Sequence, residues 1–392
     1  MNQPIKVAIV SEPGVAGVKR HVVDILRRID LQRFSVTYYY SLVRSDASYQ
    51  DEIAEIERRG ITCHNISMEG GISPIRDFRS LLKLVQGLWR QRPEILHLHS
   101  SKAGGLGRIA SLLLVPHPLV IYTPHAMACF RSRTYLWLER MLGKLTDMLV
   151  AVSASEKDDF IRWRIPNATL AEIMPLGLGN LQVAKKTLSS AGPLRPCTVG
   201  SSGRICFQKN ALLFFRVAIK MVSRYSDYRF RWIGEFSDDD EAKAVRNLLK
   251  LAGNPARIEI TGWVQNTQAQ MEGLDIFCIF SRYESFGYVT AEAMLLGVPV
   301  LATPATGTID LVRHEVTGLL AEPNEAALIG SILLLQADAS LRSRLTVNAR
   351  QFVTENHTLT KMVEVTEELY SRGTERPYSR CVSGMDVQEQ VH

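Results

Sequence analysis

The sequence contains two successive series in which short apolar runs alternate with longer amphipathic segments, and this alternation restricts the fold most. In the first half, the apolar runs predict buried strands at 7–10, 34–40, 61–66, 95–98, 120–122 and 148–152. Amphipathic helices are predicted between them, for example at 18–29, 81–90 and 135–145. Strands that alternate with helices are typical of β-α-β units, whose strands form a parallel sheet. The pattern therefore predicts an α/β protein.

The alternation stops at a polar segment and then begins again. Residues 185–196 are rich in Ser and contain Pro, which is typical of a linker. After it, strands are predicted at 198–201, 230–234, 258–261, 276–280 and 300–302, and helices at 326–335, 341–355 and 360–370. We therefore expect two Rossmann-like domains, at 1–184 and 197–355, with parallel sheets that face a central cleft. A C-terminal helix at 356–371 and a flexible tail at 372–392 complete the predicted organisation.

Composition narrows the possible partners. The formal net charge is +6 and the isoelectric point is about 9.0, which favours anionic ligands or surfaces. No nucleic-acid-binding signature accompanies this charge, so we expect no nucleic-acid partner.

No stretch has the roughly 18 consecutive apolar residues of a spanning helix, and the first residues lack the pattern of a signal peptide. The cysteines lack metal-ligand spacing and are expected to be reduced thiols of a cytoplasmic protein: Cys63, Cys129, Cys197, Cys206, Cys278 and Cys381.

The most informative motif lies in the stretch 281–300, SRYESFGYVTAEAMLLGVPV. A strand is predicted to end at Phe280, a short loop carries Glu284, and a helix begins near Gly287. The free amides and the dipole of a helix N-terminus bind phosphates and sugar hydroxyls. Gly287 permits close approach of the backbone, and Glu292 lies just over one turn into the helix. Each glutamate taken alone also fits an ordinary surface position, so both interpretations stay open on these residues.

Taken together, the two glutamates and the pattern E-S-F-G-x-x-x-x-E-A-M-x-x-G-x-P-V resemble the donor motif of retaining glycosyltransferases of family four, which have the GT-B fold. The resemblance extends over nearly the whole chain. It implies that Glu284 binds the donor sugar as a catalytic residue and that Glu292 binds the ribose of the nucleotide. Ser285, Phe286 and Gly287 then present backbone amides to the sugar and the diphosphate.

A second match follows the first predicted strand of the second domain. The segment from Gly203 to Lys209, G-R-I-C-F-Q-K, resembles the G-R-x-x-x-x-K loop of the same family, in which an Arg and a Lys hold the diphosphate. A leaving nucleoside diphosphate develops negative charge, and two cations offset that charge as a metal ion would. Loop cations are often merely solvent-exposed, but the downstream motif favours donor binding by Arg204 and Lys209.

The first domain carries a weaker match. The loop with Gly14 and Gly17 follows the first strand and resembles the glycine-rich loop that lets backbone amides approach the donor phosphate. It reads Pro-Gly-Val-Ala-Gly where many relatives have adjacent glycines, and a tight strand-to-helix turn is the alternative. His21, in the helix after this loop, is expected to pack or cap rather than to react.

Two further segments at strand ends resemble segments that line the cleft in this family. His125 follows the strand that ends in Tyr-Thr-Pro and is predicted to act near the transferred sugar. His97 lies inside a strand and is assigned to the core. Lys102 and Arg108 are candidates for the acceptor side, although Lys102 fits a solvent-exposed position equally well.

The acidic run Asp238-Asp239-Asp240 has the form of a metal-binding DxD motif. It precedes an apolar-periodic helix, so we interpret it as a helix cap and first turn. The resemblance likewise implies an enzyme that needs no metal, since Arg204 and Lys209 replace the cation. We therefore predict no metal site, no cofactor, and activity that survives chelation by EDTA.

The resemblance implies transfer of a hexose from a nucleoside-diphosphate sugar, with UDP ranked before GDP and with retention of the anomeric configuration. The first domain would bind the acceptor, a glycan or a polyprenyl-diphosphate-linked sugar of polysaccharide biosynthesis, and the second domain the donor. The helix at 356–371 crosses back to the first domain in this family. A sugar-nucleotide 2-epimerase is one alternative, against which the spacing of Glu284 and Glu292 argues. A non-catalytic binding subunit is the other, against which the presence of Arg204 and Lys209 argues.

Basic and aromatic residues suggest contact with a membrane surface. They lie in 130–164 and in the helix at 76–92: Arg131, Arg133, Trp137, Arg140, Lys144, Lys157, Arg162, Trp163, Arg164, Arg79, Lys83, Trp89 and Arg90. Each basic group near anionic lipid contributes about 1 kcal/mol. We therefore expect peripheral binding to the cytoplasmic face of a membrane. The alternative is that these helices pack on the sheet and leave their charges in water.

Overall fold

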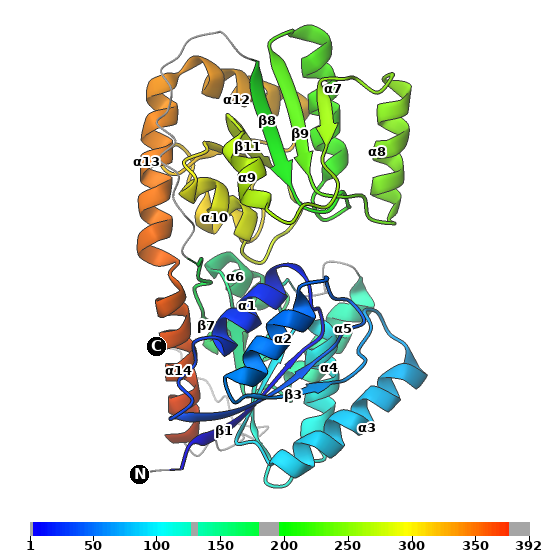
Figure 1. The fold of residues 1–392 in the computed structure, drawn as a ribbon, viewed down its shortest axis with the longest axis vertical. Helices are drawn as coiled ribbons and strands as arrows, with labels where there is room; N and C mark the ends of the chain where they lie inside the picture. Colours follow the sequence, from blue (N-terminus) through cyan, green and yellow to red (C-terminus); the bar gives the residue numbers. More distant parts are fainter. Residues whose placement is uncertain (1–2, 127–131, 180–195, 376–392) are drawn as a thin grey trace, which may run out of the picture.

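The computed structural model describes residues 3–126, 132–179 and 196–375 (Figure 1). It consists of two α/β units, one above the other along the long axis of the molecule, each built on a parallel sheet. The predicted α/β class with two parallel sheets is therefore confirmed. The predicted linker up to residue 195, the tail from residue 376, Cys129, Arg131 and Cys381 lie outside the described residues.

The first sheet has seven parallel strands in the order β3-β2-β1-β4-β5-β6-β7. They are β1 (Ile5–Ser11), β2 (Phe34–Tyr40), β3 (Thr62–Asn65), β4 (Ile95–His99), β5 (Leu119–Thr123), β6 (Met148–Ala151) and β7 (Glu172–Ile173). Val7 and Ile9 pack into one apolar cluster, and Ala8 and Val10 pack into another on the opposite face. Burial on both faces is why β1 is a nearly continuous apolar run. Because β1 pairs with both β2 and β4, the order reverses there, and ligands bind beyond the carboxyl ends of strands at such a point.

Helices connect these strands and cover both faces of the sheet. They are α1 (Ala16–Leu26), α2 (Tyr49–Arg58), α3 (Pro74–Gln91), α4 (Ser101–Ser111), α5 (Arg133–Gly143), α6 (Ala154–Arg162) and the short 3-10 helix η2 (Ala168–Leu170). Helix α3 begins seven residues before the predicted 81–90 segment, because Pro74 fits the first turn of a helix. Among the described helices, none is long and apolar enough to cross a membrane.

The second sheet has six parallel strands in the order β10-β9-β8-β11-β12-β13. They are β8 (Cys197–Ser202), β9 (Tyr228–Ile233), β10 (Ile258–Ile260), β11 (Ile276–Ile279), β12 (Val300–Ala302) and β13 (Leu319–Leu320). The helices of this unit are α7 (Ala211–Arg224), α8 (Asp240–Leu251), α9 (Thr267–Glu272), α10 (Tyr288–Leu295), α11 (Thr308–Leu311), α12 (Glu325–Ala337) and α13 (Ala339–Asn356). Strand β8 pairs with β9 and β11, so this sheet also reverses its order at its first strand.

The last helix, α14 (Leu359–Glu375), leaves the second unit and packs beside the first (Figure 1). The carboxylate of Glu367 accepts a hydrogen bond from the Asp30 amide at 2.9 Å. The Tyr370 hydroxyl lies 2.7 Å from Nδ1 of His97 inside the core of the first unit. The prediction of a flexible tail from residue 372 is wrong for its first four residues, which continue this helix. There Arg372 pairs with Glu172 of β7 at 3.3 Å.

Residues that follow strands of the first sheet contact residues that follow strands of the second. The hydroxyl of Ser155, at the start of α6, accepts a hydrogen bond from the Gly307 amide at 2.6 Å. The Ser155 amide donates to the carboxylate of Asp310 at 3.2 Å. The Thr306 hydroxyl donates to Asp159 at 2.5 Å. The carboxyl ends of the two sheets therefore meet at one interdomain boundary.

Candidate functional site

Helix α10 follows β11 at this boundary, after a loop at 280–287. Gly287 is its N-cap and has a φ of +92°, a left-handed conformation that favours glycine. Amides in the first turn of a helix have no partner within the helix, and the helix dipole adds positive potential there. The start of α10 therefore has the local structure of an anion site, and the donor role of Gly287 stays a prediction.

Glu284 lies in the loop before α10 and is only 7% exposed. Its Oε1 accepts a hydrogen bond from Lys209 Nζ at 2.6 Å and another from Ser281 Oγ at 2.6 Å. Lys209 comes from the loop after β8, so the structure brings together two predicted residues that are 75 positions apart. A buried carboxylate needs such a partner, because an unpaired charge in the interior is costly.

Glu292 lies inside α10 and is also 7% exposed. Its carboxylate forms an ion pair with Arg20 of helix α1, and the Arg20 guanidinium lies 4.7 Å from the centre of the Tyr288 ring. Arg20 belongs to the first unit, so this contact crosses the interdomain boundary. A ribose that binds Glu292 has to share or replace this ion pair. Arg20 was not identified from the sequence. The one feature that could have indicated it is its position near the start of α1, just after the loop with Gly14 and Gly17.

The other predicted donor residues lie around the same loop. Arg204 is exposed and makes no ion pair within the described ranges, so its guanidinium can reach a ligand. Ser285 is partly buried, whereas the Phe286 side chain is 1% exposed and packs 4.9 Å from the ring of His357. Phe286 can therefore contribute to binding only through its backbone.

Gly14 and Gly17, the two predicted donor-binding glycines of the first unit, have different surroundings. A Cβ on Gly14 would lie 2.4 Å from the Tyr49 ring, and the Gly14 amide donates to the Arg44 carbonyl at 2.8 Å. The predicted role of the Gly14 amide in donor binding is therefore not supported, since that amide already has a partner. Gly17 lies in the first turn of α1, and a Cβ there would lie 3.2 Å from the Tyr288 ring. Gly17 thus faces the start of helix α10 across the boundary.

His125 lies just after β5 and belongs to a group of imidazoles. Its Nε2 lies 3.1 Å from Nδ1 of His21 and 3.2 Å from Nδ1 of His99. Burial lowers the pKa of His125 and of His97 to about 3, so both rings are neutral near pH 7. His21 and His97 are fully buried, as their assignment to packing roles predicted.

The turn that carries His125 is held by a buried carboxylate. His125 and Ala126 have φ values of +55° and +68°, which non-glycine residues rarely adopt, and two such residues in succession need support from their surroundings. Glu156 accepts hydrogen bonds from the Val152 and Ala126 amides, both at 2.8 Å. Burial raises the pKa of Glu156 to about 7, although these two amides lower it. Sequence reasoning missed Glu156, which the pattern shows only as one acid in a surface helix.

The two acceptor candidates have different environments. Lys102 is partly buried, and its Nζ pairs with Asp77 of α3 at 2.7 Å. Arg108 is 1% exposed, and its guanidinium pairs with Glu139 at 2.9 Å and lies 4.1 Å from the Tyr122 ring centre. The prediction that Arg108 contacts the acceptor is therefore wrong, because its charge is neutralised inside the core. Lys102 stays a candidate.

The acidic run at 238–240 forms a helix cap, as predicted. Asp239 is the N-cap of α8, and its carboxylate accepts from the Ala242 amide at 2.9 Å and from the Phe207 amide at 2.8 Å. Burial raises the pKa of Asp239, but these hydrogen bonds outweigh that effect and lower it overall. Both oxygens of the Asp239 carboxylate therefore accept hydrogen bonds from backbone amides, as expected for a helix cap.

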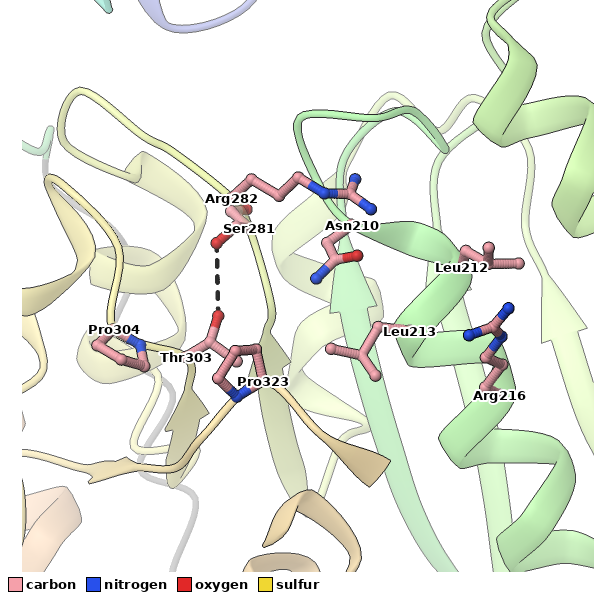
Figure 2. A pocket seen from close by; sticks show the side chains of 9 residues that line it. All are labelled: Asn210, Leu212, Leu213, Arg216, Ser281, Arg282, Thr303, Pro304 and Pro323. Carbon is pink, nitrogen blue, oxygen red and sulfur yellow. Dashed lines mark hydrogen bonds between the residues drawn. The ribbon is translucent and has the colours of Figure 1, made fainter. Parts of the chain in front are cut away.

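A cavity of about 480 Å³ lies beside the loop between β11 and α10, which carries Glu284 (Figure 2). Its lining is Asn210, Leu212, Leu213, Arg216, Ser281, Arg282, Thr303, Pro304 and Pro323. It contains none of the predicted donor residues, and it adjoins them through Ser281, whose hydroxyl reaches Glu284. Each of the two glutamates already has a cation against it, Lys209 at Glu284 and Arg20 at Glu292.

Comparison with solved structures identifies the fold as GT-B. Anabaena HepE in complex with UDP and glucose superposes with a TM-score of 0.76 over 94% of this chain and 99% of that chain, at 19% identity. WaaG, a glycosyltransferase involved in lipopolysaccharide biosynthesis, superposes with a TM-score of 0.71 over 93% of this chain and 99% of that chain, at 14% identity. The arrangement of two facing Rossmann-like units is therefore the GT-B fold, as predicted.

Sequence comparison gives the family. Residues 15–175 match the Glycosyltransferase Family 4 model, and residues 196–338 match the model for Glycosyl transferases group 1. The chain is therefore a glycosyltransferase with a Glycosyltransferase Family 4 domain followed by a Glycosyl transferases group 1 domain. It is 25% identical, over 93% of its length and 96% of the relative's, to UDP-Gal:alpha-D-GlcNAc-diphosphoundecaprenol alpha-1,3-galactosyltransferase of Escherichia coli. It is 24% identical, over 90% of its length and 96% of the relative's, to the capsular polysaccharide biosynthesis glycosyltransferase CapM of Staphylococcus aureus.

Proposed function

We propose that this glycosyltransferase transfers a hexose from a UDP-sugar to a lipid-linked glycan with retention of the anomeric configuration. The observation that carries the proposal is the Lys209–Glu284 pair, at 2.6 Å, beside the N-terminus of α10. The names of relatives support the substrate classes. The Escherichia coli relative uses UDP-Gal and a diphosphoundecaprenol-linked acceptor, and HepE was solved with UDP and glucose.

In the proposed reaction, charge is stabilised by groups of this chain. Glu284 lies against the donor sugar and stabilises the positive charge that develops as the glycosidic bond breaks. Lys209, Arg204 and the first-turn amides of α10 offset the negative charge of the leaving diphosphate. His125 lies beside the transferred sugar as a neutral imidazole. The leaving phosphate takes the proton of the acceptor hydroxyl on the same face of the sugar, so no covalent nucleophile is needed.

Thermal stability in the presence of sugar nucleotides tests the donor class. A ligand at one hundred times its dissociation constant adds about 2.7 kcal/mol to the free energy of unfolding. We expect UDP-sugars to raise the melting temperature most, GDP-sugars less, and ADP-sugars least. Equal shifts with all three would contradict the UDP assignment. Product that forms from the donor without any acceptor would indicate the epimerase alternative.

Glu292→Ala should weaken the binding of donor and of free UDP equally. In the proposal, the Glu292 carboxylate accepts hydrogen bonds from the ribose, and loss of a charged acceptor costs about 1.5–3 kcal/mol, which is about tenfold to 100-fold in the dissociation constant. Calorimetric titration with UDP measures the dissociation constant. Arg20→Met is the matched variant, since it removes only the partner that competes for Glu292, and it should bind UDP at least as tightly as wild type. Normal UDP binding by Glu292→Ala would contradict the placement of the ribose.

We also propose that helix α3 holds the enzyme at the cytoplasmic face of a membrane. Four large apolar side chains at helical spacing are more than half exposed along it: Ile75, Phe78, Leu82 and Trp89. Four exposed basic residues flank this α3 face: Arg76, Arg79, Lys83 and Arg90. An apolar helix face bordered by cations fits the headgroup region of an anionic bilayer. The predicted segment on α5 adds exposed Trp137 and Arg140.

Removal of charge from the α3 face tests this contact. Arg79→Gln/Lys83→Gln should reduce partitioning onto anionic vesicles by about 2 kcal/mol, or about 30-fold, at low salt. Co-sedimentation with vesicles measures the effect. Arg229→Gln/Lys250→Gln removes one exposed Arg and one exposed Lys from the other unit and should change partitioning little. Equal wild-type partitioning onto neutral and anionic vesicles would refute the proposal.

A further inference from the structure

Four of the nine histidines of the chain gather beside the interdomain boundary. The rings of His97 and His99 lie 4.0 Å apart between centroids, those of His21 and His125 lie 4.9 Å apart, and those of His99 and His125 lie 5.5 Å apart. They come from three separate elements, namely α1, β4 and the turn after β5. Such a concentration of buried imidazoles needs an explanation beyond packing, because each ring buries two polar nitrogens.

His97 differs from the other three, because both of its nitrogens have hydroxyl partners. Its Nδ1 lies 2.7 Å from the Tyr370 hydroxyl, and its Nε2 lies 2.9 Å from the Thr123 hydroxyl. A hydroxyl can donate or accept, so a neutral His97 is fully satisfied in either tautomer. His97 is therefore a structural residue of the core.

The ring nitrogens of His21, His99 and His125 cannot all form good hydrogen bonds with one another. The Nε2 atom of His125 lies close to Nδ1 of both His21 and His99, at 3.1 and 3.2 Å. If His125 carries its proton on Nε2, one N–H faces two lone pairs. If it does not, His21 and His99 must share a single lone pair. In addition, the other nitrogen of His21 faces only the sulfur of Met174, and that of His99 is buried without a partner among the described residues.

A metal ion would resolve this arrangement, because it accepts all three lone pairs at once. Zinc binds imidazole nitrogen at about 2.0–2.1 Å in a tetrahedron, which places ligand nitrogens about 3.3 Å apart. Two of the three nitrogen separations are already close to that value, and all three ligand atoms lie within 4.8 Å of one another. Small ring rotations of His21 or His99 would complete the geometry. We propose that His21, His99 and His125 form a zinc site that holds Zn²⁺ reversibly.

The chemistry of the three ligands favours zinc over harder cations. Neutral imidazoles suit Zn²⁺ and other late transition metals, whereas Mg²⁺ and Ca²⁺ prefer oxygen ligands. Ligating histidines normally donate their second N–H to a carboxylate or carbonyl, and loss of such support costs about 10- to 100-fold in affinity. Within the part of the chain that the structure describes, His21 has only a thioether in that position and His99 has no partner there. The site is therefore expected to release zinc readily rather than hold it as a resident cofactor.

Bound zinc would inhibit the transfer reaction. His125 is the one partly exposed ligand of the three, so the fourth coordination position opens on the side where the proposed function puts the transferred sugar. This consequence rests on the proposed function, whereas the metal site itself does not. Metal-free protein is the active form, and chelation by EDTA is expected to preserve or raise its activity.

The test measures zinc binding to the full chain without substrate. Wild-type protein should take up one Zn²⁺ per chain in competition with a chromogenic chelator, and Co²⁺ in its place should give the visible absorption of a tetrahedral complex. His125→Gln and His99→Gln should each weaken zinc binding at least about tenfold, as expected for the loss of one of three ligands. His64→Gln, which changes an exposed histidine elsewhere in the first unit, should bind zinc like wild type.

Two outcomes would overturn the site, namely no stoichiometric binding by wild type, or binding that survives both His125→Gln and His99→Gln. Circular dichroism establishes that each variant is folded. Should His99→Gln fail to fold, the partly exposed His125 gives the decisive variant. A failure of zinc to inhibit transfer, with binding intact, would contradict only the position of the sugar.

Discussion

Glu284→Gln is expected to lower turnover by about 10²–10³-fold while the affinity for UDP stays close to that of wild type. The substitution keeps the shape of a side chain that is 7% exposed and hydrogen-bonded to Ser281. It removes the negative charge that, in the proposed mechanism, is felt more strongly in the transition state than in the ground state. Steady-state kinetics with saturating donor, combined with calorimetric titration of UDP, separates the two effects.

Glu284→Gln also changes the contact with Lys209, whose Nζ lies 2.6 Å from the Glu284 carboxylate. This effect has to be separated from the loss of charge beside the sugar. A neutral Gln still accepts a hydrogen bond from Lys209 but attracts its charge less strongly. The affinity for UDP therefore shows whether the contact of Lys209 with the diphosphate has changed. Glu322→Gln removes one exposed carboxylate of the same unit and should leave turnover intact. Wild-type turnover in Glu284→Gln, with a melting temperature near that of wild type, would show that the donor sugar lies elsewhere.

The strands were predictable where they are long and buried on both faces. The run at 34–40 contains the whole of β2, because a strand in the middle of a covered sheet must be apolar at nearly every position. Strands β7 and β13 were not predicted, since each has two residues and two residues carry no periodicity. The end of α14 was also missed. Its last turn is polar, and it is held by contacts such as Arg372–Glu172 that join positions 200 residues apart.

The shape of the segment 281–300 was predictable for a different reason. Glu284, Gly287 and Glu292 lie within one short stretch, so a linear pattern describes most of their geometry. The ion pair of Arg20 with Glu292 joins residues 272 positions apart, and no local pattern describes it. The cluster of His21, His99 and His125 was missed in the same way. His125 was predicted as a site residue by itself, whereas His21 and His99 each look like an ordinary histidine in a helix or at the end of a strand.

Arg108 shows how local patterns mislead. It lies in a glycine-rich helix that follows a strand, which is a common setting for a residue that binds an anion. The three-dimensional structure instead places it under α5, where it meets Glu139 at 2.9 Å. The Glu139 carboxylate also accepts a hydrogen bond from the Tyr122 hydroxyl at 3.1 Å, and this contact and burial raise the pKa of Tyr122. A buried network of this kind has a structural role and large consequences for stability.

Arg108→Met should therefore lower the free energy of unfolding by about 3–5 kcal/mol. The substitution leaves the Glu139 carboxylate, 5% exposed, without its counter-ion, and an uncompensated buried charge is the main cost. For a domain of this size the melting temperature should fall by about 6–20 °C. Urea unfolding followed by circular dichroism measures the change, with attention to the transition of the first unit because two domains need not unfold together.

The double variant Arg108→Met/Glu139→Gln separates this explanation from simple loss of packing. It removes both charges and keeps an acceptor for Tyr122, so it should recover most of the lost stability, since well-packed neutral replacements of buried ion pairs are often tolerated. Folded Arg108→Met protein, assayed well below its melting temperature, should have the acceptor KM of wild type. A raised acceptor KM together with unchanged stability would instead restore Arg108 to the acceptor site, because only a residue that contacts the substrate changes binding without changing unfolding.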